Sequence, residues 1–155
     1  MNVLDQTDEA AQQIYQDLLD RIANSYRDND FEALTGLIHL PYTVLSFGPV
    51  TVLENPTDLR KLFDGIRRYL SRTGITHYHR VCLVGRFTAT DEIEAMHETR
   101  LLAGAQLVET PYPVKSVVRR FGDKWKVCES DNALEPDRGF GRIFQEHRAN
   151  RGRRH

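Results

Sequence analysis

The sequence predicts an α+β domain in which helices pack on one face of a curved antiparallel sheet. Through much of the first half of the chain apolar residues recur at helical spacing, and from Ile75 onward they alternate as they do in strands. Further along, Gly122-Asp123 stands between two runs rich in β-branched and aromatic residues, which is a strong hairpin signal. Helices followed by long strands are typical of the α+β class.

Three helices are expected in the first half of the chain. The first begins at Thr7, a residue type that caps helices, and continues to about Arg27. The second covers residues 31–38 and carries an apolar stripe. The third opens with a capping residue and a proline, Asn55-Pro56, and ends at Gly74.

The other periodic segments are predicted strands. Their ranges are 42–47, 50–53, 75–87, 93–102 and the two arms of a hairpin over 114–131. A further helix is expected over 139–147. We therefore expect one domain over residues 1–135, followed by a polar, Arg-rich extension over 136–155.

The two faces of the hairpin over 114–131 differ in character. With a two-residue loop, Val118 lies opposite Val127 and Ser116 lies opposite Glu129. One face then carries Val114, Ser116, Val118, Arg120, Trp125, Val127, Glu129 and Asp131. The opposite face carries three cations, so we expect it to be the outer one. The first face, apolar near the turn and acidic at its far end, is then the floor of a pocket.

The preceding pair of strands turns three histidines toward the pocket if the turn between them has an odd number of residues. Leu83 then lies opposite His97, and His77, His79 and Val81 point inward with it. A slip of one residue would move His97 to the outer face, so this prediction depends on the register.

One metal ion cannot hold all three histidines in that register. His77 and His79 lie about 7 Å apart on one face, whereas His97 lies about 13 Å from His79 along the strand. We therefore expect no metal site, and histidines that line a cavity or bond within the core.

Composition excludes several classes of function. The net charge of −1 offers no general attraction for nucleic acid or an anionic membrane, and no apolar run approaches the roughly 20 residues of a membrane span. Two cysteines outside any CxxC pair form no disulfide framework, and the acidic N-terminus is unlike a signal peptide, so a cytoplasmic location is expected. No phosphate loop or nucleotide fingerprint is present, and no cofactor is expected.

Three segments together resemble the nuclear transport factor two-like superfamily, in particular its SnoaL-like and ketosteroid-isomerase-like branches. They are YRDNDFEALTGL, GPVTVLENPTDLRKLFDGI and VVRRFGDKWKV, and the similarity extends over roughly residues 10–134. The resemblance implies a cone in which helices and a curved sheet enclose a cavity, often in a sheet-to-sheet homodimer. The superfamily includes isomerases, dehydratases, epoxide hydrolases, polyketide cyclases and non-catalytic binding domains, so the fold does not determine the function.

Together with this resemblance, the residues lead us to expect a cavity for a small apolar molecule, cyclic or not, with cofactor-free proton transfer of the isomerase, dehydratase, cyclase or hydrolase type if there is turnover. A histidine beside a carboxylate can move a proton near neutral pH, and a buried carboxylate has a raised pKa. We expect His79 or His97 as the base, with Glu129 or Asp131 orienting or donating. The expected ligand-binding residues are Tyr26, Tyr42, His77, Val81, Trp125 and Val127.

An alternative is a non-catalytic interaction module. Apolar residues and both cysteines are scattered among cations on the expected outer face, which a second copy of the chain could cover. In that alternative side chains fill the cavity, and the outer sheet face is the functional surface.

Overall fold

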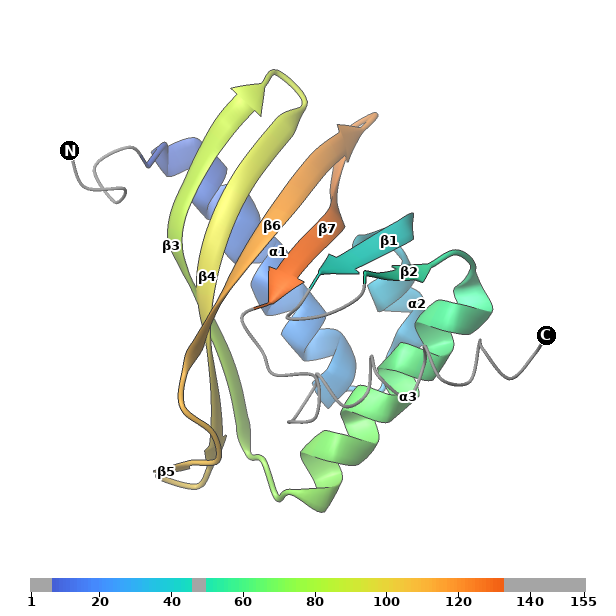
Figure 1. Ribbon diagram of the computed structural model, residues 1–155, viewed down its shortest axis with the longest axis vertical. Helices are drawn as coiled ribbons and strands as arrows, with labels where there is room; N and C mark the ends of the chain where they lie inside the picture. Colours follow the sequence, from blue (N-terminus) through green and yellow to red (C-terminus); the bar gives the residue numbers. More distant parts are fainter. Residues whose placement is uncertain (1–6, 46–49, 133–155) are drawn as a thin grey trace.

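The computed structural model of the protein describes residues 7–45 and 50–132. These residues form three helices, α1 (Glu9–Arg27), α2 (Phe31–Thr35) and α3 (Pro56–Arg72). They also form seven strands, β1 (Ile38–Leu45), β2 (Thr51–Leu53), β3 (His77–Ala89), β4 (Glu92–Ala103), β5 (Gln106–Leu107), β6 (Tyr112–Phe121) and β7 (Lys124–Asn132). The curved sheet lies across α1, and α3 lies beside α2 (Figure 1). The predicted α+β class is confirmed.

The sheet is mixed, whereas the sequence predicted an antiparallel one. Its strand order is β2-β1-β7-β6-β4-β3, with β5 paired to β4. Most neighbours are antiparallel, but β1 and β7 run parallel. A short hairpin loop forces its two strands to run antiparallel, and a long connection does not. The chain between β1 and β7 contains α3 and the long strands, so this pair is free of that constraint.

Hydrogen bonds at the helix ends explain where α2 ends and where α3 begins. Helix α2 ends at Thr35, before the predicted residue 38, because the carbonyl of Leu37 accepts the N–H of Val127 at 2.9 Å and draws the chain into the sheet. Helix α3 begins as predicted, with the side chain of Asn55 accepting the N–H of Asp58 at 2.9 Å.

Helix α1 is docked along the free edge of β3. Gln16 donates through Nε2 to the carbonyl of Arg80 at 2.9 Å and accepts through Oε1 from the N–H of Cys82 at 2.8 Å. The N–H of Asp8, the N-cap of α1, donates to the carbonyl of Gly85 at 2.7 Å. These bonds satisfy edge groups that would otherwise be open to another strand.

A one-residue bulge at Leu83 divides β3 into two halves of different register. On the turn side, β3 and β4 pair in the predicted register; beyond the bulge, Cys82 and not Leu83 lies opposite His97. Because side chains alternate between faces, the extra residue exchanges the two faces of the remaining strand. The prediction for His77, His79 and Val81 is therefore wrong, since they lie on the outer face. The inner face carries Tyr78, Arg80 and Cys82 instead.

A second bulge, at Cys128, has the same effect on β7. Val118 lies opposite Val127 as predicted, but beyond the bulge Ser116 pairs with Ser130 and not with Glu129. The extra residue again exchanges the faces, so the inward placement predicted for the two carboxylates is wrong. Glu129 and Asp131 lie on the outer face, and Ser130 lies on the inner face.

Some predictions concern residues outside those that the structure describes: the helix over 139–147 and the extension over 136–155. Within residues 7–45 and 50–132, no helix is both long enough and apolar enough to cross a membrane. Within the same ranges, no group of three His, Cys, Asp or Glu side chains is placed to hold a metal ion.

Candidate functional site: a cationic cavity inside the cone

A cavity of about 70 Å³ lies between the inner face of the sheet and helices α1 and α3. Its lining from the helices is Tyr15, Leu19, Ile22, Tyr26, Leu59, Leu62 and Ile66. Its lining from the strands is Ile38, Tyr42, Tyr78, Arg80, His97, Thr99, Tyr112, Val114, Ser116, Val127, Ser130 and Asn132. The described lining is thus apolar on the α3 side, rich in hydroxyl groups on the sheet side, and free of Asp and Glu.

Arg80 brings a positive charge to this cavity. The residue is half-buried, and its Nε is buried without a hydrogen-bond partner among the described residues. Nη2 donates to the carbonyl of Leu19 at 3.2 Å, and the guanidinium carbon lies 4.8 Å from the centre of the Tyr78 ring. Arginine stays protonated in proteins, so the charge is permanent.

Five tyrosines surround Arg80 in the cavity lining, namely Tyr15, Tyr26, Tyr42, Tyr78 and Tyr112. Burial raises the pKa of each hydroxyl, and raises that of Tyr42 to about 12. At neutral pH the hydroxyls therefore keep their protons, and they can donate hydrogen bonds without bringing negative charge.

A chain of hydrogen bonds runs through the cavity wall from α1 to β1. The hydroxyl of Tyr15 lies 2.5 Å from Nδ1 of His97 and donates to Oγ of Ser116 at 2.8 Å. Oγ of Ser116 lies 3.5 Å from Oγ of Ser130, which accepts from the hydroxyl of Tyr42 at 2.6 Å. Because the hydroxyl of Tyr15 donates its hydrogen bond to Ser116, its oxygen accepts from Nδ1–H of His97. In this tautomer of His97, Nε2 is an acceptor.

His97 is neutral in this setting. The side chain is only 3% exposed, and burial, followed by the charge of Arg80, lowers the pKa of His97 to about 2. A group with that pKa is a very weak base near neutral pH. His97 therefore acts in the wall as a hydrogen-bonding group.

The structure brings together four of the residues that the sequence singled out. His97, Tyr26, Tyr42 and Val127 all line the cavity. Trp125 does not, because it lies at the turn end of β7, where its ring is 6.0 Å from that of Phe87.

The other candidates lie on the outer face, away from His97. His77 and His79 are exposed and stack on each other with ring centres 5.7 Å apart, and Val81 is 51% exposed. Glu129 and Asp131 border a hollow on the outer face. No carboxylate among the described residues is paired with His97, so the predicted histidine–carboxylate pair does not form.

Sequence reasoning missed Arg80, and with it Tyr15 and Ser130, whereas it placed Ser116 correctly on the face that forms the pocket floor. The residue types offered no clear signal for this face, because tyrosine and histidine are buried about equally often, arginine is mostly exposed, and the opposite alternation carries Val81 and Leu83.

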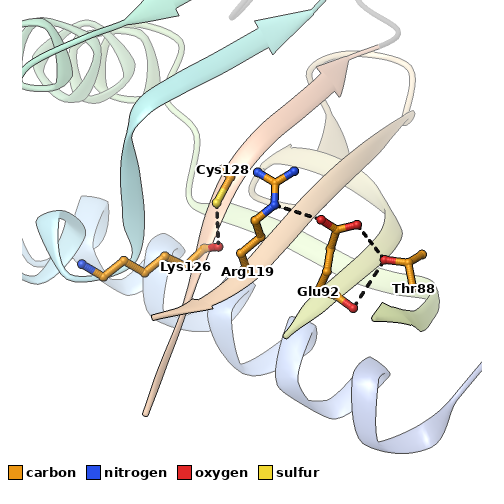
Figure 2. Close-up of polar contacts among 5 residues, drawn as sticks. All are labelled: Thr88, Glu92, Arg119, Lys126 and Cys128. Atoms are coloured by element: carbon orange, nitrogen blue, oxygen red, sulfur yellow. Dashed lines mark hydrogen bonds and ion pairs between the residues drawn. The ribbon is translucent and has the colours of Figure 1, made fainter. Parts of the chain in front are cut away.

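The outer face carries a separate polar cluster near the hairpin turns (Figure 2). Glu92 accepts from Oγ1 of Thr88 at 2.8 Å and from Nε of Arg119 at 2.9 Å, and these two bonds lower the pKa of Glu92. Beside them, Sγ of Cys128 lies 3.6 Å from the carbonyl of Lys126, and burial raises the pKa of the thiol. A thiol with a raised pKa is a poor nucleophile, so we assign this cluster a structural role.

Comparison with known proteins shows the fold. No protein-family model matches the chain, and no curated protein matches it. A protein of unknown function from Shewanella oneidensis, described as nuclear transport factor two-like, superposes with a TM-score of 0.61 at 9% identity, covering 79% of this chain and 98% of that one. A protein of unknown function with a cystatin-like fold from Nostoc punctiforme gives 0.60 at 15% identity, over 84% and 96% of the two chains.

A third structure, from Novosphingobium aromaticivorans, is described both as nuclear transport factor two-like and as having a cystatin-like fold. It superposes with a TM-score of 0.58 at 16% identity and covers 87% of this chain and 88% of that one. These identities carry information about the fold and not about activity. The chain therefore has the cystatin-like cone fold of nuclear transport factor two-like proteins.

Proposed function

We propose that this protein binds a small molecule in the cavity between α1, α3 and the sheet. The observation that carries the proposal is the composition of the lining: an apolar wall from α3 faces a wall of convergent hydrogen-bonding groups around Arg80. A lining of apolar side chains with a few directed polar groups is the pattern of small-molecule sites, and the volume of about 70 Å³ restricts this one to a very small ligand.

Filling the cavity with a larger side chain should weaken binding at least tenfold. Ile66 projects from α3 into the cavity, whereas Ile14 on α1 is partly buried outside the cavity lining. In a ligand-observed NMR screen of compounds with only a few heavy atoms, which is the size that a cavity of about 70 Å³ admits, we expect hits on the wild type to weaken at least tenfold in Ile66→Phe and to persist in Ile14→Phe. The absence of any hit on the wild type, or equal binding to Ile66→Phe, would contradict the proposal.

Acid–base turnover has weaker support than binding. It would require the Tyr15–His97 pair to exchange a proton with the ligand, but burial lowers the pKa of His97 to about 2 and raises that of Tyr15. Both shifts oppose proton transfer near neutral pH. We therefore place ligand binding ahead of catalysis for this cavity.

A second candidate function uses the outer face of the sheet. A hollow of about 580 Å³ lies there, with apolar side chains from Leu45, Val84, Met96 and Val117. Its border also carries both signs of charge, from Arg86, Lys115, Glu94, Glu129 and Asp131. A patch with both charge signs can be complementary to itself across a two-fold axis, so the partner that we propose is a second copy of the chain.

This homodimer has a direct test in light scattering. We expect the wild type to have about twice the monomer mass of 17.9 kDa, and Val117→Lys to have the monomer mass. The matched control is Val81→Lys, because Val81 is exposed on the same face outside the hollow. A wild type of monomer mass, or a Val117→Lys variant that stays dimeric, would eliminate this interface.

A further inference from the structure

We propose that the molecule bound in the cavity is a small organic carboxylate, whose carboxylate group accepts hydrogen bonds from the guanidinium of Arg80. This inference rests on the proposed binding function and adds the chemical class of the ligand. It arises from charge, donor geometry and cavity size.

The charge of Arg80 has no counter-charge in the described part of the chain. Other arginines of the protein form ion pairs on its surface, for example Arg60 with Asp64 at 3.2 Å and Arg119 with Glu92 at 2.9 Å. Arg80 forms no ion pair with any described carboxylate, and the described cavity lining contains no Asp or Glu. The Nε–H of this half-buried cation is buried without an acceptor, which is costly, and an anionic ligand would supply both the acceptor and the counter-charge.

The donor geometry of Arg80 matches a carboxylate. One face of the guanidinium is covered by the Tyr78 ring at 4.8 Å, and Nη2 is turned toward the carbonyl of Leu19 at 3.2 Å. Nε, without a protein acceptor among the described residues, remains on the edge of the same plane. Arginine binds carboxylates through this edge with parallel in-plane hydrogen bonds.

The neighbours of Arg80 favour an anion as well. The tyrosine hydroxyls around it keep their protons because burial raises their pKa values, so they carry no negative charge that would repel a carboxylate. His97 is neutral, with Nε2 as an acceptor when Nδ1–H is engaged with Tyr15. Arg80 is thus the one charge that a ligand meets in the described lining.

Cavity size limits the ligand to a short chain. A volume of about 70 Å³ is roughly that of two water molecules at about 30 Å³ each. A carboxylate with a few carbons fits this scale, with its apolar end toward Leu59, Leu62 and Ile66 on α3. The planar fork of an arginine matches both carboxylate and phosphate, so it is the apolar α3 wall that favours a carboxylate with a hydrocarbon end over inorganic phosphate.

The test compares propionate with propionamide, which has nearly the same shape and no charge. Protein labelled with ¹⁵N-arginine is titrated with each compound, and the Nε–H resonance of Arg80, assigned by its loss in Arg80→Lys, is followed by NMR. We expect propionate to shift this resonance and to bind at least tenfold more tightly than propionamide and inorganic phosphate. The comparison of affinities uses only the wild type, so it holds even if a variant folds poorly.

Variants then separate charge from structure. Arg80→Met should weaken propionate binding at least tenfold and leave propionamide binding within about twofold. Arg80→Lys, which keeps the charge without the planar fork, should fall between Arg80→Met and the wild type. The matched control is Arg100→Met, because Arg100 is exposed on the outer face and should leave both affinities unchanged.

The outcomes distinguish this inference from the function on which it rests. Equal binding of propionate and propionamide, or tighter binding of phosphate, would overturn the carboxylate assignment and leave the binding function intact. If no small molecule binds the wild type, both fall. Glu135 and Asp137 follow Asn132 closely in the sequence. If only the double variant Glu135→Gln, Asp137→Asn binds propionate, the partner of Arg80 is a carboxylate of this chain, and the inference is wrong.

Discussion

Lowering the pH from 7 to 4 should reduce the free energy of unfolding more in the wild type than in a His97→Gln variant. The expected difference between the two reductions is about 3 kcal/mol. His97 has a pKa of about 2 in the folded protein, against about 6.5 when unfolded. Between about pH 6.5 and pH 2, His97 therefore binds a proton in the unfolded chain but not in the folded protein. Each pH unit in that window removes about 1.4 kcal/mol of stability.

The surroundings of His97 explain the direction of this effect. Tyr15 from α1 bonds to Nδ1, Arg80 from β3 contributes the nearest positive charge, and Val114 pairs with His97 from β6. Nothing described there stabilises an imidazolium, so protonation would place a second cation beside a buried one.

Urea unfolding at pH 7, 5.5 and 4 provides the measurement. Carboxylates titrate in both proteins and cancel in the difference, and His79→Gln serves as the control because His79 is exposed on the outer face. Its pH dependence should match that of the wild type. Parallel curves for the wild type and His97→Gln would show that His97 titrates normally and is more open to water than the cavity implies.

Replacing Gly85 by alanine should lower the free energy of unfolding by about 1–3 kcal/mol, the usual cost of overpacking. A Cβ on Gly85 would lie 3.1 Å from both the Cα and the N of Gln12 on α1. These are backbone atoms of a helix, so they cannot swing aside as a flexible side chain does. The helix would have to move from the sheet, although the N–H of Asp8 holds it to Gly85 at 2.7 Å.

Gly36→Ala is the matched control for this prediction. A Cβ on Gly36 would meet only the carbonyl oxygen of Ala33, at 3.6 Å, which is an ordinary contact. Because alanine restricts the unfolded chain, this variant should be neutral or more stable by about 0.4–1 kcal/mol. Chemical denaturation of both variants checks the difference. Equal stability of Gly85→Ala and the wild type would mean that α1 is not held tightly against β3.

Much of the fold could be predicted from the sequence because its signals are local. Capping residues and apolar periodicity placed α3 within a residue at its start, and the alternating segments located the long strands. The pairing near each hairpin turn was also predictable, as with Val118 opposite Val127, since the turn sets the register beside it.

The candidate site could be predicted only in part, because its residues depend on two single-residue bulges. The bulge at Leu83 turned His77 and His79 out and Arg80 in, and the bulge at Cys128 turned Glu129 out and Ser130 in. His97 kept its predicted face because β4 contains no bulge at that point. The sequence predicted an acidic pocket lined by histidines, whereas the structure has a cationic pocket lined by hydroxyl groups.

The sequence by itself determined the fold class, the helices and the existence of an inner face, because periodicity and turn residues act over a few neighbouring positions. Only the tertiary structure decided which side chains face the cavity. Whether a bulge forms depends on how the strands fit against one another and against α1. On either side of it, apolar and polar residues still alternate, so the sequence pattern does not reveal it. The tertiary structure therefore made Arg80, and not the histidine–carboxylate pair, the centre of the site.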